Sequence, residues 1–400
     1  MVLSPTERAL RALVKDYQSL NASTCAELSH TPSPLEFHRF VAANRPVVLR
    51  GQGKRDRVKA LERWSDRYLE EKMAGKEVAI SVSPDGNADS VVDGVFAEPA
   101  TVRMTLSDLF SRLAAEQALA DPSSSKEPVY YLQSQNGNLA DEYLPLLEDV
   151  GRDGPAWARE AFGEAPEVAN IWIGGGRSKT SLHKDPYENL YLVIRGSKTF
   201  TLLPPSEAYC VHEQLYPHAT YSYSPPSPSD PSSSSSSSSS SGSGGGGTFS
   251  LVRTTPELLV PWIPLDPTLP VPPPHDDNDD DGVAKKEYPR YALARPMTVT
   301  LQAGDMLYLP ALWYHHVAQA PGWGPDAAGG DGSAPEGEGA VEGEGEGEGE
   351  GVKAAIAVNW WTDMRYEGAG YSVARFVRRL VLSLEGREEE EGEEEEEGEA

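Results

Sequence analysis

Short strand-like segments, several of them followed by a turn signal, recur from residue 78 to residue 361 and constrain the fold most. They are rich in Val, Ile, Tyr and Trp, which favour pleated, half-buried strands. Turn residues follow or join them at 84–86, 195–197 and 303–305. We therefore predict a mainly β protein, built as an antiparallel sandwich or barrel. The segments are 78–82, 129–133, 168–174, 189–194, 198–205, 297–301, 306–310, 313–317 and 354–361.

Helical patterns flank this β-rich region at both ends. Residues 1–75 place apolar side chains at helical spacing, with one short extended segment at 46–51. Residues 372–384 form a second amphipathic pattern. The sequence thus predicts a helical N-terminal region over 1–75 that packs on one large domain, 76–384, which ends in a helix.

Low-complexity segments interrupt the large domain and follow it. They consist of Ser, Pro and Gly at 224–247, Pro and Asp at 270–282, Gly and Glu at 321–351, and mostly Glu at 385–400. Such compositions bury too little apolar surface to offset the entropy of ordering the chain. We predict three disordered inserts and a disordered acidic tail. The remaining residues still suit a single large domain.

The formal charge of −27 is concentrated in those acidic segments, so the rest of the chain is nearly balanced. No basic stripe suited to nucleic acid is visible, and we expect no nucleic-acid partner. The acidic tail is interpreted as a solubilising appendage.

Cysteine usage and hydropathy indicate the compartment. The two cysteines, Cys25 and Cys210, imply no disulfide framework and suggest a reducing environment. The N-terminus lacks the apolar core of a secretory signal, and no run of 18 apolar residues suggests a membrane span. We expect a protein of the cytoplasm, with the nucleus as a second location.

A histidine and an aspartate stand two residues apart in TSLHKDPYENLY, at His183 and Asp185. Alternate residues of a strand share a face, so both side chains point one way if this stretch is extended. Pro186 supports an extended Asp185. An imidazole and a carboxylate are two of the three ligands in the facial triad of non-haem Fe(II) oxygenases. Taken alone, such a pair more often marks a surface histidine beside a surface aspartate.

A histidine pair further along the chain offers the third ligand. His315 and His316 lie in WYHHV, flanked by aromatic residues and Val317, which argues against an exposed strand. His315 shares a face with Trp313 and Val317, whereas His316 shares one with Tyr314. Alternation alone leaves open which histidine is the ligand.

Lys198 begins the segment KTFTLLPP, in phase with Phe200 and Leu202. These apolar neighbours predict an inward-facing lysine, which is costly unless it meets an anion. The alternative is a turn lysine whose stem reaches to water. With the histidines and the aspartate, Lys198 predicts a metal site that also binds an acidic organic ligand.

In these motifs the chain resembles the jumonji-C (cupin-type) 2-oxoglutarate oxygenases, over about residues 30–380. The resemblance rests on HKDPYENLYLVIRGSKTF, AGDMLYLPALWYHHV and AVNWWTDM. It implies a double-stranded β-helix (cupin, jelly-roll) core that uses Fe(II), with 2-oxoglutarate and O2 as co-substrates. It also implies that Lys198 binds the distal carboxylate of 2-oxoglutarate, and that no catalytic side chain acts beyond the metal ligands. The implied metal ligands are His183, Asp185 and His315, and the implied 2-oxoglutarate contacts are Tyr131, Thr180, Asn189, Lys198 and Asn359.

The small jumonji-only members of this family imply a protein substrate. They include lysyl (3S)-hydroxylases, which points to a lysine of a developmentally regulated GTP-binding protein. The helix at 372–384 is amphipathic enough to allow a homodimer. The alternatives are a cupin module that binds without turnover, a histone-directed demethylase and a peptidase, although no HExxH motif is present.

Overall fold

The computed structural model describes most of the chain outside the low-complexity segments. The predicted inserts and the tail lie largely outside the described residues, although Ser224 ends strand β13 and Gly322 pairs with Ala354 in a β-bridge. The described residues are 3–119, 121–122, 125–133, 137–226, 247–268, 287–323, 353–367 and 369–384.

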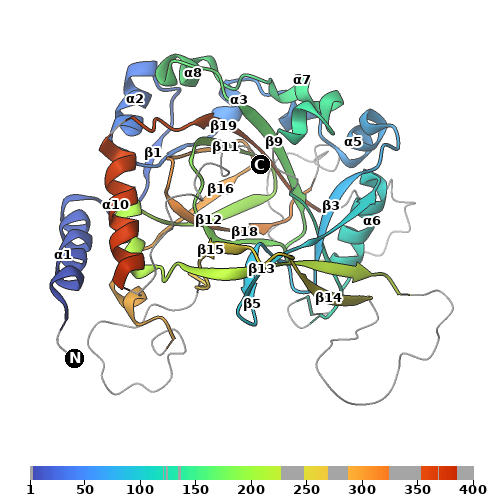
Figure 1. Ribbon diagram of the computed structural model, residues 1–400. Helices are drawn as coiled ribbons and strands as arrows, with labels where there is room; N and C mark the ends of the chain where they lie inside the picture. Colours follow the sequence, from blue (N-terminus) through green and yellow to red (C-terminus); the bar gives the residue numbers. More distant parts are fainter. Residues whose placement is uncertain are drawn as a thin grey trace, which may run out of the picture.

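Three β-sheets form the centre of the molecule (Figure 1). The largest has nine strands in the order β1 (Ala26–Leu28), β2 (Val47–Leu49), β17 (Met306–Leu309), β11 (Tyr187–Arg195), β19 (Ala355–Asp363), β9 (Val168–Gly174), β8 (Val129–Leu132), β3 (Val78–Ser83) and β7 (Ala100–Met104). The second has five, in the order β16 (Met297–Gln302), β12 (Ser197–Leu203), β18 (Tyr314–Ala320), β10 (Lys179–His183) and β4 (Asn87–Ala88). The third runs β14 (Thr248–Arg253), β13 (Gln214–Ser224), β6 (Val95–Glu98) and β5 (Ser90–Val92), and β15 (Leu259–Trp262) also pairs with β13.

The first two sheets pack face to face. A buried apolar cluster joins Tyr191 and Val193 of β11 to Phe200 and Leu202 of β12. The two strands are joined at Gly196, whose φ is +69° and where a Cβ atom would lie 2.5 Å from the Ala320 carbonyl oxygen. Only glycine fits this turn. The predicted jelly-roll fold class is confirmed.

Helices cover the outside of this core (Figure 1). Figure 1 places α2, α3, α8 and α7 along one edge, α5 and α6 at one side, and α1 beside α10 at the other. Val14 of α1 and Val381 of α10 belong to one buried cluster, so the first and last helices pack together. No helix in the described part of the chain is long and apolar enough to cross a membrane. The helices are α1 (Pro5–Leu20), α2 (Pro34–Ala42), α3 (Gln52–Arg55), α4 (Ala60–Arg63), α5 (Asp66–Met73), α6 (Leu106–Gln117), α7 (Leu147–Val150), α8 (Ala156–Phe162) and α10 (Ala369–Leu384).

The N-terminal region also contributes strands. The predicted extended segment 46–51 contains β2, which pairs with β17 and with β1. The sequence pattern did not indicate β1, nor the third sheet. Strand β13 is largely half-buried or exposed, so its side chains lack the apolar alternation by which a buried strand is recognised.

Candidate metal centre

Three predicted ligands meet between β10 and β18. His183 ends β10, and the antiparallel pairing places it directly opposite His315 on β18. Asp185 lies in the loop after β10 rather than on an extended strand, and its carbonyl oxygen accepts a hydrogen bond from the Leu312 N–H at 2.8 Å. The ligand atoms of the three side chains lie within 4.8 Å of one another. Asp185 Oδ2 is 3.7 Å from His183 Nε2 and 3.5 Å from His315 Nε2.

Backbone carbonyls orient both imidazoles. His183 Nδ1 lies 2.8 Å from the Ser181 carbonyl oxygen, and His315 Nδ1 lies 2.9 Å from that of Trp313. A carbonyl can only accept, so Nδ1 carries the proton in each ring. Each Nε2 therefore presents its lone pair towards the other ligands, as in protein metal sites where the second ring nitrogen donates to a carbonyl.

The protonation states suit a metal cation. Burial, helped by the neighbouring His315, lowers the pKa of His183 to about 4. Burial alone would raise the pKa of Asp185, but the two imidazoles outweigh it and hold that pKa below its usual value. Two neutral imidazoles and one carboxylate are the donor set of a facial Fe(II) site, so the residues present fit the predicted metal.

His316 points away from the triad. It follows His315 on β18 and pairs across the sheet with Thr201. Its side chain is buried, burial lowers its pKa, and its Nδ1 has no hydrogen-bond partner in the described part of the chain. The choice that alternation left open is thus made by the pairing of β10 with β18, which brings His315 to His183.

Separate substitutions of the two histidines test this placement. We expect His315→Ala to weaken Fe(II) binding more than about a hundredfold, because losing even an outer partner of a ligand costs about 10–100-fold. We expect His316→Ala to change the dissociation constant less than about tenfold, because it contacts no ligand. Titration of both variants with Fe(II) under anaerobic conditions measures this. The reverse order would mean that the register of β18 is shifted by one residue.

Lys198 is buried at 1% exposure near the triad. Its Nζ donates to the Tyr131 hydroxyl at 3.3 Å and to Gln319 Oε1. No carboxylate in the described part of the chain pairs with it, and burial lowers its pKa from 10.5 to about 7. A buried ammonium with only neutral partners is poised for an anionic ligand.

A small cavity at the triad brings the other predicted residues together. Asn359 Oδ1 accepts a hydrogen bond from Trp172 Nε1 at 2.9 Å, and Asn359 Nδ2 donates to Asn189 Oδ1 at 3.2 Å. Lys198 does not line the cavity itself and reaches it through Tyr131, a phenol whose pKa burial raises. The lining residues are Tyr131, Trp172, Thr180, His183, Asp185, Asn189, Tyr191, Phe200, His315, Val317, Asn359 and Trp361.

Three site residues were missed from the sequence. Gln319 lies four residues after His315 and two after Val317. Alternation along β18 could therefore have placed it on the same face as His315. The local sequence around Trp172 predicts a strand but does not indicate that this side chain belongs to the site. Trp262 of β15 stacks on the His183 ring at 6.0 Å, a contact between segments that are distant in sequence.

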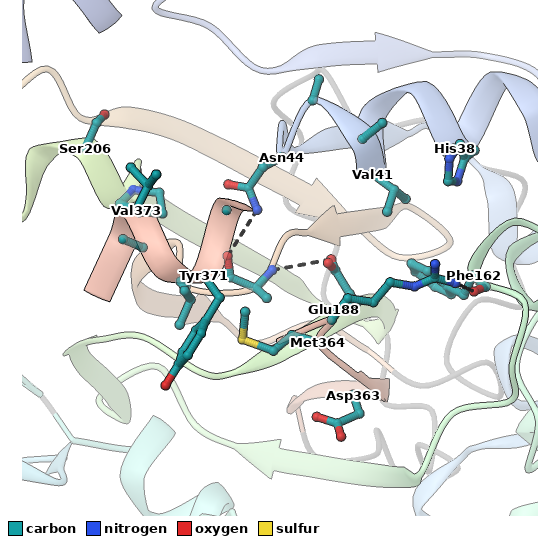
Figure 2. A pocket seen from close by; sticks show the side chains of 18 of the residues that line it. His38, Val41, Asn44, Phe162, Glu188, Ser206, Asp363, Met364, Tyr371 and Val373 are labelled. Atoms are coloured by element: carbon teal, nitrogen blue, oxygen red, sulfur yellow. Dashed lines mark hydrogen bonds between the residues drawn. The ribbon is translucent and has the colours of Figure 1, made fainter. Parts of the chain in front are cut away.

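Two larger cavities lie nearby. One of about 570 Å³ includes His183 in its wall. The other, of about 620 Å³, contains no triad residue; Glu188 and Met364 are in its wall (Figure 2), and it shares Asp363 with the first. There the Glu188 carboxylate accepts hydrogen bonds from the Tyr308 hydroxyl at 2.6 Å and the Ala311 N–H at 3.4 Å, and burial raises its pKa.

The jelly-roll core and the His-Asp-His triad define a cupin-type oxygenase. The chain belongs to the cupin-like JmjC family, and residues 32–368 match the model of the Cupin-like domain. The family and the enzyme class predicted from the sequence, a jumonji-type 2-oxoglutarate-dependent oxygenase, are confirmed by this membership.

Three similar proteins match over most of their length. The human bifunctional peptidase and (3S)-lysyl hydroxylase JMJD7 is 33% identical over 365 residues, or 90% of this chain and 92% of that protein. JmjC domain-containing protein E of Dictyostelium discoideum is 31% identical over 353 residues, or 87% and 86%. The lysine-specific demethylase JMJ32 of Arabidopsis thaliana is 30% identical over 356 residues, or 88% and 84%.

Proposed function

We propose that this protein is an Fe(II)- and 2-oxoglutarate-dependent dioxygenase that hydroxylates a protein side chain. The observation that carries the proposal is a facial triad next to a buried lysine that has no carboxylate partner among the described residues. A protein that only binds a metal would not need the buried lysine, because an unpaired buried ammonium lowers the stability of the fold.

Each residue has a role in this proposal. Two imidazole nitrogens and the Asp185 carboxylate hold the metal, which when bound supplies the activation of O2 by one-electron chemistry. Lys198 pairs with the distal carboxylate of 2-oxoglutarate, with Tyr131 and Thr180 as hydroxyl donors. The hydrogen bonds of Asn359 with Trp172 and Asn189 hold the amides that line the pocket.

We further propose lysine as the target, hydroxylated at C-3 in a developmentally regulated GTP-binding protein. The support is the name of the human relative, a (3S)-lysyl hydroxylase, and a cavity of about 570 Å³ beside His183 that could admit a protein segment.

We also propose that α10 mediates a homodimer, because Val373 and Phe376 are 57% and 61% exposed. The two separate free cysteines support the cytoplasm as its location.

Turnover of 2-oxoglutarate tests the proposal. The purified chain is supplied with Fe(II), ascorbate, O2 and 2-oxoglutarate, with and without such a GTPase, and succinate is measured beside the intact mass of the GTPase. We expect succinate formation coupled to the gain of one oxygen atom on a lysine. Loss of a methyl group from a methylated histone, or cleavage of the polypeptide, would instead support the demethylase or peptidase activities that the relatives' names carry. No succinate under any condition would overturn the proposal.

A further inference from the structure

We propose that Tyr187, Asp363 and Glu167 form a recognition site for a cationic side chain at the entrance to the metal centre. The inference rests on the proposed function, which brings a protein side chain to this metal. It goes further by assigning the residues that select a positive charge.

The site lies where the small metal cavity meets the cavity of about 570 Å³. His183 contributes to the walls of both the small metal cavity and the cavity of about 570 Å³. Tyr187 lines the larger cavity and Trp361 lines the smaller one. Their rings stack in parallel, with centroids 4.8 Å apart. The stacked pair therefore forms a wall that passes from one cavity to the other.

A polar atom in this wall lacks a partner. Trp361 is 6% exposed, and its Nε1 has no hydrogen-bond acceptor within the described ranges. A buried indole N–H is normally paired, because burying it without an acceptor is destabilising. An ammonium group has no acceptor, so the partner of this N–H would be another atom of the bound molecule, such as a peptide carbonyl oxygen. This feature is independent of the nearby carboxylates.

Two carboxylates flank Tyr187. Asp363 is the direct partner of Tyr187 in the β11–β19 ladder, and the Glu167 N–H donates to the Trp361 carbonyl at 2.7 Å. Tyr187, Glu167 and Asp363 all line the cavity of about 570 Å³. Neither Glu167 nor Asp363 forms an ion pair with another described residue. Two carboxylates are therefore available beside the Tyr187 ring for a cationic ligand.

The cationic side chains that line this cavity come from the loop after β10 and from α10. Arg375 and Arg378 of α10 line it together with Lys184, and the buried Glu213 carboxylate pairs with Lys184 at 3.1 Å and with Arg378 at 2.9 Å. Glu213 therefore offsets part of this positive charge. A cationic side chain is attracted to the β19 side of the cavity, where an aromatic face and two carboxylates can receive it.

The ligand that fits is a peptide bearing an ammonium group. The test uses two synthetic peptide pools with randomised flanks and a central lysine or Nε-acetyl-lysine, passed over the immobilised full chain. Apparent dissociation constants are compared by surface plasmon resonance at low and high salt. We expect the parent to prefer the lysine pool by about tenfold at low salt, because acetylation removes the charge that makes the ion-pair and cation–π contacts. We expect the preference to shrink at high salt.

Variants assign the preference to residues. We expect the Glu167→Gln, Asp363→Asn double variant to lower the preference to about twofold, and Tyr187→Leu to lower it as well. Glu164→Gln removes an exposed carboxylate three residues away that lines the other cavity, and we expect it to keep the parent preference. An undiminished preference in the double variant, or no preference in the parent, would overturn the inference. Because binding is read without turnover, absence of succinate from the parent would count against the proposed oxygenase activity and not against this site.

Discussion

Asp185→Ala and His183→Ala are each expected to abolish 2-oxoglutarate decarboxylation and to leave the fold intact. Each substitution removes one of three ligands, and even the loss of an outer partner of a ligand costs about 10–100-fold in affinity or activity. We therefore expect Fe(II) affinity to fall more than about a hundredfold. His183 ends β10 and Asp185 lies in the loop after it, so neither substitution removes an aliphatic side chain from the apolar core. Succinate formation, Fe(II) titration and thermal unfolding measure the three outcomes.

A histidine outside the site supplies the control. His30 is exposed and does not line the metal cavity, so His30→Ala should behave like the parent. Retained decarboxylation in Asp185→Ala or in His183→Ala would remove the oxygenase proposal. Because burial lowers the pKa of His183 to about 4, protons should not compete for this ligand at neutral pH.

Lys198→Ala is expected to weaken 2-oxoglutarate binding at least about thirtyfold. Removing one partner of a desolvated charge pair typically costs about 2–5 kcal/mol, and about 1.4 kcal/mol corresponds to tenfold. Fe(II) binding should change little, because Lys198 contacts Tyr131 and Gln319 rather than a metal ligand. Lys198→Arg should also bind weakly, since the planar guanidinium needs more room. Calorimetric titration with 2-oxoglutarate measures the effect, and parent-like binding by Lys198→Ala would mean that another residue holds the distal carboxylate.

The pH dependence of the parent supplies a second test of Lys198. Its pKa is about 7 in the ligand-free fold against an ordinary 10.5, so between these values the unfolded chain binds more protons than the folded chain. The contribution of Lys198 to the free energy of unfolding should therefore rise with pH across this window. An anionic ligand favours the charged lysine, so 2-oxoglutarate binding above pH 7 should take up protons. Calorimetry in buffers of different ionisation enthalpy measures that uptake, which should disappear in Lys198→Ala.

The local residue pattern was sufficient to predict the strands and the type of chemistry. Strand composition and the turn at Gly196 identify β11 and β12, and the i, i+2 spacing of His183 and Asp185 suggests a ligand pair. Alternation also predicts an inward Lys198, which the structure buries at 1% exposure. These inferences succeed because the alternation of side chains along a strand is a local property.

The tertiary structure decided which residues meet. Alternation offered His315 and His316 equally, and only the pairing of β10 with β18 brings His315 opposite His183. Asp185 joins the site from a loop held by the Leu312 N–H, although an extended strand was expected. The stack of Trp262 on His183 and that of Tyr187 on Trp361 join segments far apart in the chain. Strand partners and register are set by long-range burial and hydrogen bonding, so a pattern confined to one segment could not specify them.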